Sequence, residues 1–235
     1  MTQIKRHIPN TLTCGNLICG GIATYNAFMG DIPLAMTFII AGAVFDFFDG
    51  FVARLLKVSS PIGKELDSLA DDITFGLAPA AIVFSLFHTL HYPSWMDSIV
   101  AYIPYAAFLI AAFSALRLAK FNLDERQSSS FIGMPTPANA LFWGSLALGL
   151  QDTWTIWEGS VYTLLILILL TCYLLIAEIP MFALKFKHFN WKGNEVRYLF
   201  LISCIPAFIF LGIAAFAAII LWYVILSFIT QKTVS

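Results

Sequence analysis

Residues 45–72 read FDFFDGFVARLLKVSSPIGKELDSLADD, and they place four aspartates at the ends of two apolar segments. Asp46 and Asp49 are three residues apart, so on a helix they share one face. Asp67 and Asp71 are four residues apart and share a face for the same reason. Because only a short connection joins the two segments, the sequence predicts two antiparallel helices whose four carboxylates meet at one end.

Four carboxylates gathered in this way repel one another unless a cation lies between them. Clusters of acidic oxygens hold hard divalent cations, so the sequence predicts a site for Mg²⁺ or Mn²⁺. The structural alternative is that the aspartates cap helix ends or pair with Arg54, Lys57 and Lys64 near the membrane surface. The spacing of all four aspartates together favours the metal site.

Composition places these helices in a membrane. Of the 235 residues, 60% are hydrophobic and 11% are charged, whereas soluble domains have about 45–50% and about 25%. A water-soluble globule is therefore excluded, and at about 20 residues per transmembrane helix the chain supplies roughly six to eight spans. The net charge of −1 and the scattered basic residues argue against nucleic-acid binding, which leaves membrane lipids and small solutes as partners.

Pro, Gly and polar residues divide the chain into seven apolar runs, at residues 11–29, 33–56, 66–89, 99–118, 136–150, 161–184 and 198–229. The last run has 32 residues, and as one helix it is about 48 Å long, whereas the hydrocarbon core is about 30 Å thick. Either a hairpin turns near Gly212 and gives eight spans, or one long tilted helix gives seven. The predicted fold is an all-α, polytopic transmembrane helical bundle.

Lys and Arg are concentrated in alternate connections, and this predicts the orientation in the membrane. Twelve of the thirteen basic residues precede the first run or lie around the second, fourth and sixth connections. These parts, including the N-terminus, are therefore predicted to be cytoplasmic, and the other connections are predicted to face outward. The carboxylates then lie at the cytoplasmic face, and Lys232 joins the other basic residues only in the eight-span arrangement.

The four aspartates belong to a pattern with eight fixed positions, DxxDGxxARx8Gx3Dx3D, whose other members here are Gly50, Ala53, Arg54 and Gly63. Over this stretch the chain resembles the CDP-alcohol phosphotransferases. The resemblance implies that the chain cleaves the pyrophosphate of a CDP-alcohol, transfers the phosphoryl-alcohol part to a second alcohol and releases CMP.

The resemblance also implies residue roles and a domain plan. Two divalent metal ions, Mg²⁺ or Mn²⁺, would be held by Asp46, Asp49, Asp67 and Asp71. Asp71 would also take the proton from the attacking hydroxyl. The signature residues that contact the CDP-alcohol would be Asp49, Gly50, Ala53, Arg54 and Gly63. The family's six-helix core would occupy residues 1–185, a hydrophobic extension at 186–235 would pack on the same bundle, and the protein would be a homodimer.

Four further stretches resemble the serine-accepting branch of this family: PNTLTCGN (9–16), DSLADDITFGLAPA (67–80), SALRLAKFN (114–122) and FIGMPTPANA (131–140). This resemblance implies CDP-diacylglycerol as the donor, L-serine as the acceptor, phosphatidylserine and CMP as products, and a location in a prokaryotic inner membrane. Asp72 and Thr74 depart from that branch, where a non-acidic residue and Ser are usual, and they bear on acceptor specificity.

Polar residues in apolar helices supply the remaining candidates. An amino-acid acceptor needs a cation for its carboxylate, and Arg offers a bidentate fork. Arg117, with Asn122 five residues further on, is predicted to bind serine; the alternative for Arg117 is anchoring at the cytoplasmic face. Thr13 and Asn16 share a face of the first helix and are predicted to donate hydrogen bonds to CDP-diacylglycerol, with helix–helix hydrogen bonding as the alternative.

Two other functions share some of these features. A phosphatidylglycerophosphate or phosphatidylinositol synthase would carry the same signature and differ in the acceptor. A divalent-cation transporter would also place carboxylates in a helical bundle, but it needs polar or broken helices near the midplane. Here the acids cluster at one interface and most runs are apolar in the middle, so the transporter is the remote alternative.

Overall fold

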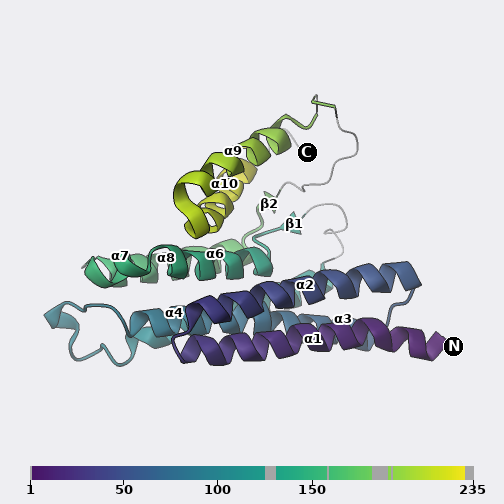
Figure 1. Ribbon diagram of the computed structural model, residues 1–235, viewed down its shortest axis with the longest axis horizontal. Helices are drawn as coiled ribbons and strands as arrows, with labels where there is room; N and C mark the ends of the chain where they lie inside the picture. The colour runs from purple at the N-terminus through teal and green to yellow at the C-terminus, as the bar shows by residue number, and fades with distance from the viewer. Residues whose placement is uncertain (1, 125–130, 158, 182–189, 192, 231–235) are drawn as a thin grey trace.

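The structure, a computed structural model, describes residues 2–124, 131–157, 159–181, 190–191 and 193–230 (Figure 1). It begins with two long helices, α1 (Thr2–Phe28) and α2 (Ile32–Leu56), which pack side by side. Gly30, at φ +80°, makes the tight turn between them, and Asp31 Oδ1 caps α2 by accepting a 3.0 Å hydrogen bond from the Leu34 N–H. The start of α1 therefore lies beside the end of α2.

After α2, the described chain continues through these elements: α3 (Pro61–Asp71), η1 (Asp72–Leu77), α4 (Ala78–Phe87), η2 (Ser94–Met96), η3 (Ile103–Ala107), α5 (Phe108–Leu123), β1 (Phe131–Ile132), α6 (Thr136–Gly149), α7 (Gln151–Ile156), α8 (Ser160–Ile176), β2 (Pro180–Met181), α9 (Glu195–Leu211), η5 (Gly212–Ala214) and α10 (Ala215–Thr230). In Figure 1, α6 and α8 run between the layer that contains α1 to α4 and the tilted pair of α9 and α10.

The turn from α2 to α3 forms the end of the molecule at which the signature aspartates lie. Lys57 adopts the left-handed conformation, with φ 52°, and ends α2. Ser60 starts α3, because its Oγ accepts a 3.1 Å hydrogen bond from the Gly63 N–H. α3 runs directly into the π-helical turn η1 and then into α4, so Pro61–Phe87 is one helical segment.

The helix α4 is the centre of the core. Eight of its ten residues are buried, and a helix that is apolar on all sides belongs inside a bundle. It packs against α1, α5 and α6, and the largest fully buried side chains around it include Phe75, Phe87 and Trp143. This core holds the helices in fixed positions around the signature aspartates.

The C-terminal hydrophobic segment forms a hairpin. Gly212, at φ +54°, separates α9 from α10. The two helices run antiparallel, since Phe208 stacks edge-on against Phe216 and Trp222 Nε1 donates a 3.0 Å hydrogen bond to Ser203 Oγ. The predicted hairpin is thus confirmed and the single long helix is wrong. The hairpin packs on the bundle through α10 and α6.

The run predicted at 161–184 is helical only as far as Ile176. Pro180 disfavours a continuing helix, and β2 pairs instead with β1 as a two-residue antiparallel ladder, a small addition to the predicted all-α fold. The ladder leads into Gly133, which at φ +75° packs so closely that an added Cβ would lie 2.9 Å from the Leu175 carbonyl oxygen.

Length and composition agree with the predicted membrane bundle. Four segments of the described chain are long and apolar enough to cross a membrane: Ile32–Leu56, Pro61–Phe87, Ile103–Leu123 and Glu195–Thr230. α8 is a shorter apolar helix, and large apolar side chains such as Leu169 and Phe210 lie exposed on the outer surface, where lipid would cover them. The predicted domain boundary at 185/186 and the connections around Arg126 and Lys187 lie outside the described residues.

Candidate active site

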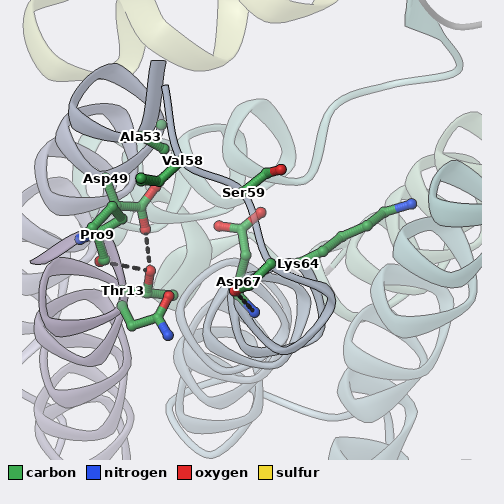
Figure 2. Close-up of a pocket in the computed structure, with 12 residues that line it drawn as sticks. Pro9, Thr13, Asp49, Ala53, Val58, Ser59, Lys64 and Asp67 are labelled. Atoms are coloured by element: carbon green, nitrogen blue, oxygen red, sulfur yellow. Dashed lines mark hydrogen bonds between the residues drawn. The ribbon is translucent and has the colours of Figure 1, made fainter. Parts of the chain in front are cut away.

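A cavity of about 260 Å³ opens where the start of α1, the end of α2 and the start of α3 meet. Six of the residues predicted for the donor and metal sites line it: Thr13, Asp49, Gly50, Ala53, Gly63 and Asp67. Figure 2 shows Thr13 and Asp49 on one side of the cavity and Asp67 on the other. Signature residues of α2 and α3 therefore line the same cavity.

Three of the four aspartates form a compact group. One carboxylate oxygen each of Asp46, Asp49 and Asp67 lies within 4.8 Å of the others. Asp67 Oδ1 is buried without a hydrogen-bond partner among the described residues, and an unpartnered buried carboxylate oxygen is costly unless it binds a cation. The hydroxyl of Thr13 donates a 2.6 Å hydrogen bond to Asp49 Oδ2 and fixes that side chain (Figure 2). The donor set therefore fits a hard divalent cation.

Asp71 lies outside this group of three, although its charge interacts with those of Asp46 and Asp67. Its Oδ1 accepts a 3.0 Å hydrogen bond from Asn16 Nδ2 on α1. Asn16 is fully buried and does not line the cavity. The Asn16 amide therefore binds Asp71 on α3. This contact is a hydrogen bond between two helices, which was the alternative to donor binding for Asn16.

The π-helical turn η1 fixes the position of Asn16. Thr74 Oγ1 donates a 3.0 Å hydrogen bond to the backbone carbonyl of Asn16. Thr74 also fills the space left by two glycines: its Cγ2 lies 2.6 Å from where a Cβ of Gly42 would be, and a Cβ on Gly20 would overlap its hydroxyl and backbone. Thr74, a departure from the serine-accepting pattern, is therefore a contact between three helices and does not line the cavity.

Asp72 faces a different neighbour from Asp71. Its Oδ1 lies 2.6 Å from where a Cβ of Gly76 would be, and the Cβ of Ser114 on α5 lies 3.0 Å from the same point. Adjacent residues on a helix point about 100° apart, so Asp71 faces α1 while Asp72 faces α5. Asp72 does not line the cavity at the signature aspartates.

The residues predicted to bind serine are separated in the structure. Arg117 is 7% exposed, lies over the ring of Phe121 at 5.1 Å and interacts electrostatically with Asp71. Asn122 lies at the end of α5 and contacts α3. Its Nδ2 donates a 2.7 Å hydrogen bond to Ser68 Oγ, and its backbone carbonyl oxygen accepts a 2.8 Å hydrogen bond from Lys64 Nζ. Arg117 therefore interacts with an aspartate of the signature, whereas Asn122 joins α5 to α3.

Arg54 is exposed and does not line the cavity. Conversely, the cavity includes residues that sequence reasoning missed: Pro9, Asn10, Val58, Ser59, Ser60 and Lys64. A Cβ on Gly63 would lie 3.0 Å from both Asn10 Oδ1 and Ser60 Oγ, so these side chains crowd one wall. Two signals in the sequence point to such residues. Asn10 stands in the stretch PNTLTCGN, and Ser60 directly precedes a proline at the start of a helix, which is a capping pattern. Lys64 extends from the cavity toward α5 (Figure 2).

Comparison with known proteins identifies the family of the chain. The family model for CDP-alcohol phosphatidyltransferases matches residues 6–229. A CDP-diacylglycerol–serine O-phosphatidyltransferase of Bacillus subtilis (strain 168) is 35% identical over 193 residues, covering 80% of this chain and 94% of the relative. Proteins of the same name from Mycobacterium leprae (strain TN), at 31% identity over 94% of this chain and 72% of the relative, and from Helicobacter pylori (strain J99), at 36% over 57% and 54%, are also similar. The chain belongs to the CDP-alcohol phosphatidyltransferase family.

Proposed function

We propose that the protein transfers the phosphatidyl group of CDP-diacylglycerol to the hydroxyl of L-serine and releases phosphatidylserine and CMP. The observation that carries this proposal is the group of three carboxylates in and beside a cavity formed by the family signature. The names of the bacterial relatives support serine as the acceptor.

The cavity at the start of α1 is the proposed site of the CDP part of the donor. Gly50 has no side chain, and the nearest atom to the position of an added Cβ there is Arg54 Nη2 at 4.0 Å, so the ligand can approach the backbone closely at Gly50. Thr13 and Asn10 supply polar groups to the same cavity, and Ala53 and Val58 supply apolar contacts. We assign Arg54, which is exposed at the end of α2, to the outer edge of the donor site.

Asp46, Asp49 and Asp67 would hold the divalent metal, Mg²⁺ or Mn²⁺, and Asp71 would complete the set if two ions bind. A metal at this position would supply positive charge that offsets the negative charge of the pyrophosphate. The chain itself keeps the carboxylates in place, because the Thr13 hydroxyl holds Asp49 and the Asn16 amide holds Asp71. The proposed site is therefore ordered before the donor binds.

Asp71 is the proposed general base. Its carboxylate would accept the proton of the serine hydroxyl as the serine oxygen forms a bond to the phosphorus. The bond between that phosphorus and the bridging oxygen breaks in the same reaction, and CMP leaves with the bonding electrons. Asn16 leaves the second carboxylate oxygen of Asp71 available, since its hydrogen bond is to Oδ1.

The proposed location is a prokaryotic inner membrane with the active site on the cytoplasmic face, and the proposed assembly is a homodimer. The distribution of Lys and Arg supports the orientation. CDP-diacylglycerol, L-serine and membrane lipids are the proposed partners.

The test is to incubate membranes that contain the protein with CDP-diacylglycerol, Mn²⁺ or Mg²⁺, and a panel of alcohols, and to identify the lipid product. We expect phosphatidylserine with L-serine and no product without a divalent metal. If the main product were phosphatidylglycerophosphate or phosphatidylinositol, serine would be the wrong acceptor, but the proposed reaction class would still hold. No product with any alcohol would contradict both.

A further inference from the structure

A ring of three hydrogen bonds joins α3 to the C-terminal end of α5. Lys64 Nζ donates a 2.8 Å hydrogen bond to the backbone carbonyl oxygen of Asn122, and Asn122 Nδ2 donates a 2.7 Å hydrogen bond to Ser68 Oγ. Ser68 Oγ in turn donates a 3.3 Å hydrogen bond to the backbone carbonyl oxygen of Lys64. The ring therefore spans one turn of α3, and its three residues occupy none of the fixed positions of the family signature.

The end of α5 has a physical reason to bind a cation. The last four carbonyl groups of an α-helix have no N–H partner within the helix, and the carbonyl of Asn122 is one of these, since α5 ends at Leu123. The partial negative charge at a helix C-terminus also favours a nearby ammonium group. Lys64 therefore caps α5 from another helix, and Asn122 is held through both its backbone and its side chain.

The same turn of α3 carries Asp67, one of the three carboxylates proposed to bind the metal. Adjacent residues on a helix point about 100° apart, so Asp67 lines the proposed donor cavity while Ser68 contacts α5. In Figure 2 the side chains of Asp67 and Lys64 leave α3 in different directions. One turn thus presents a carboxylate to the site and two polar groups to α5.

Polar contacts have a large share in holding this turn in place. Ala70 alone is buried among the eleven residues of α3, so apolar packing fixes the helix weakly. The three carboxylates of the group repel one another until a cation binds. α5, in contrast, packs against η1, α4 and α8 and has four buried side chains. It therefore offers a firm support to which α3 can be fastened.

We propose that Ser68, Asn122 and Lys64 are positioning residues, which hold Asp67 at the metal site by fastening its helical turn to α5. This inference rests on the proposed metal site and gives Asn122 a role other than serine binding. Ser68 and Asn122 do not line the proposed donor cavity, so they act through Asp67. Lys64 lines the cavity, and a change there would not separate positioning from direct contact with the donor.

Mn²⁺ titration of Ser68→Ala and Asn122→Leu tests the inference, with electron paramagnetic resonance as the readout. The full-length protein is titrated in lipid nanodiscs without donor or acceptor. We expect the Kd for Mn²⁺ to rise about threefold to tenfold in each variant, which corresponds to the loss of one neutral hydrogen bond. The double variant should bind Mn²⁺ no more weakly than either single variant, because both changes remove the bond between the same two side chains.

Two controls accompany the titration. Ser68→Thr keeps the hydroxyl and should bind Mn²⁺ as the wild type does. Glu65→Gln changes an exposed carboxylate of α3 that does not line the cavity, and it should also have no effect.

A wild-type Kd for Mn²⁺ in both Ser68→Ala and Asn122→Leu would overturn the inference. Fully additive losses in the double variant would overturn it too, because the two residues would then act independently. Failure of the proposed function is a different result. The wild-type protein would then bind no Mn²⁺, or it would bind Mn²⁺ and make a lipid from another alcohol or none.

Discussion

Asp67 and Asp71 are one helical turn apart, yet the structure gives them different surroundings. Asp67 belongs to the group of three carboxylates and has a buried oxygen without a partner among the described residues. Asp71 is held by the amide of Asn16. This difference supports a division of labour in which Asp67 binds the metal and Asp71 moves the proton.

Replacing Asp67 with Asn should abolish turnover and weaken Mn²⁺ binding. The change removes one charged oxygen from a site that needs several to hold a hard cation, and we expect turnover to fall by about 10³-fold or more. Activity assays and Mn²⁺ titration followed by electron paramagnetic resonance measure the two effects. The control is Glu65→Gln, because Glu65 is an exposed carboxylate on α3 that does not line the cavity. Near wild-type turnover together with wild-type Mn²⁺ affinity would show that the cluster is structural.

The sequence could predict which polar residues lie near the site, but not which atoms they contact. Thr13 and Asn16 both stand on the inner face of α1, and only Thr13 lines the cavity. The difference arises because α1, α2 and η1 pack closely around Asn16 through Gly20, Gly42 and Thr74, a tertiary contact that spacing along one helix does not report. Asn122 was assigned to serine for its position, and its contacts with Ser68 and Lys64 come from the packing of α3 on α5.

At the scale of elements, η1 is the feature that joins the helices of the site. A π-helical turn inserts one extra residue into a helix and is common at functional sites. Here it follows Asp71 directly and places Thr74 against α1 and α2. The sequence predicted the helix but not this turn, because a π-helical turn differs from an α-helix in its backbone hydrogen bonds, which the spacing of side chains in the sequence does not report.

Thr74→Val and Thr74→Ser form a matched pair that tests this element. Val keeps the shape but removes the hydroxyl that donates to the Asn16 carbonyl, at a cost of about 1 kcal/mol in the free energy of unfolding. We expect kcat to fall about threefold to tenfold in Thr74→Val and to stay near wild type in Thr74→Ser, with KM for CDP-diacylglycerol unchanged in both. Assays of kcat and thermal unfolding measure these effects, and a wild-type kcat in Thr74→Val would show that η1 does not position Asp71.

Whole-molecule features were predictable to the extent that they depend on composition and periodicity. The membrane bundle, the antiparallel order and the C-terminal hairpin follow from long apolar runs and from Gly212. The early end of α8 and the ladder of β1 with β2 depend on pairing between residues about 50 positions apart in sequence.

The orientation in the membrane gives a prediction for the whole molecule. In a background in which Cys14, Cys19, Cys172 and Cys204 are replaced, Asp152→Cys should react with an impermeant maleimide added outside intact cells. Lys57→Cys should react only after the membrane is opened, because the Lys-rich connections are retained in the cytoplasm. Labelling of position 152 from the cytoplasmic side alone would contradict the orientation and move the proposed active site to the outer face.

The most direct test of the central claim is the turnover number for serine incorporation in Asp71→Asn compared with Asp72→Asn. The two positions are adjacent, but Asp71 faces Asn16 on α1, whereas Asp72 faces Ser114 on α5. Loss of a positioned base costs about 10²-fold to 10⁴-fold in rate, so Asp71→Asn should lose at least that much and still bind CDP-diacylglycerol, whereas Asp72→Asn should keep most of its activity. If Asp72→Asn stops turnover and Asp71→Asn leaves it largely intact, the assignment of Asp71 as the base and the proposed reaction centre are both wrong.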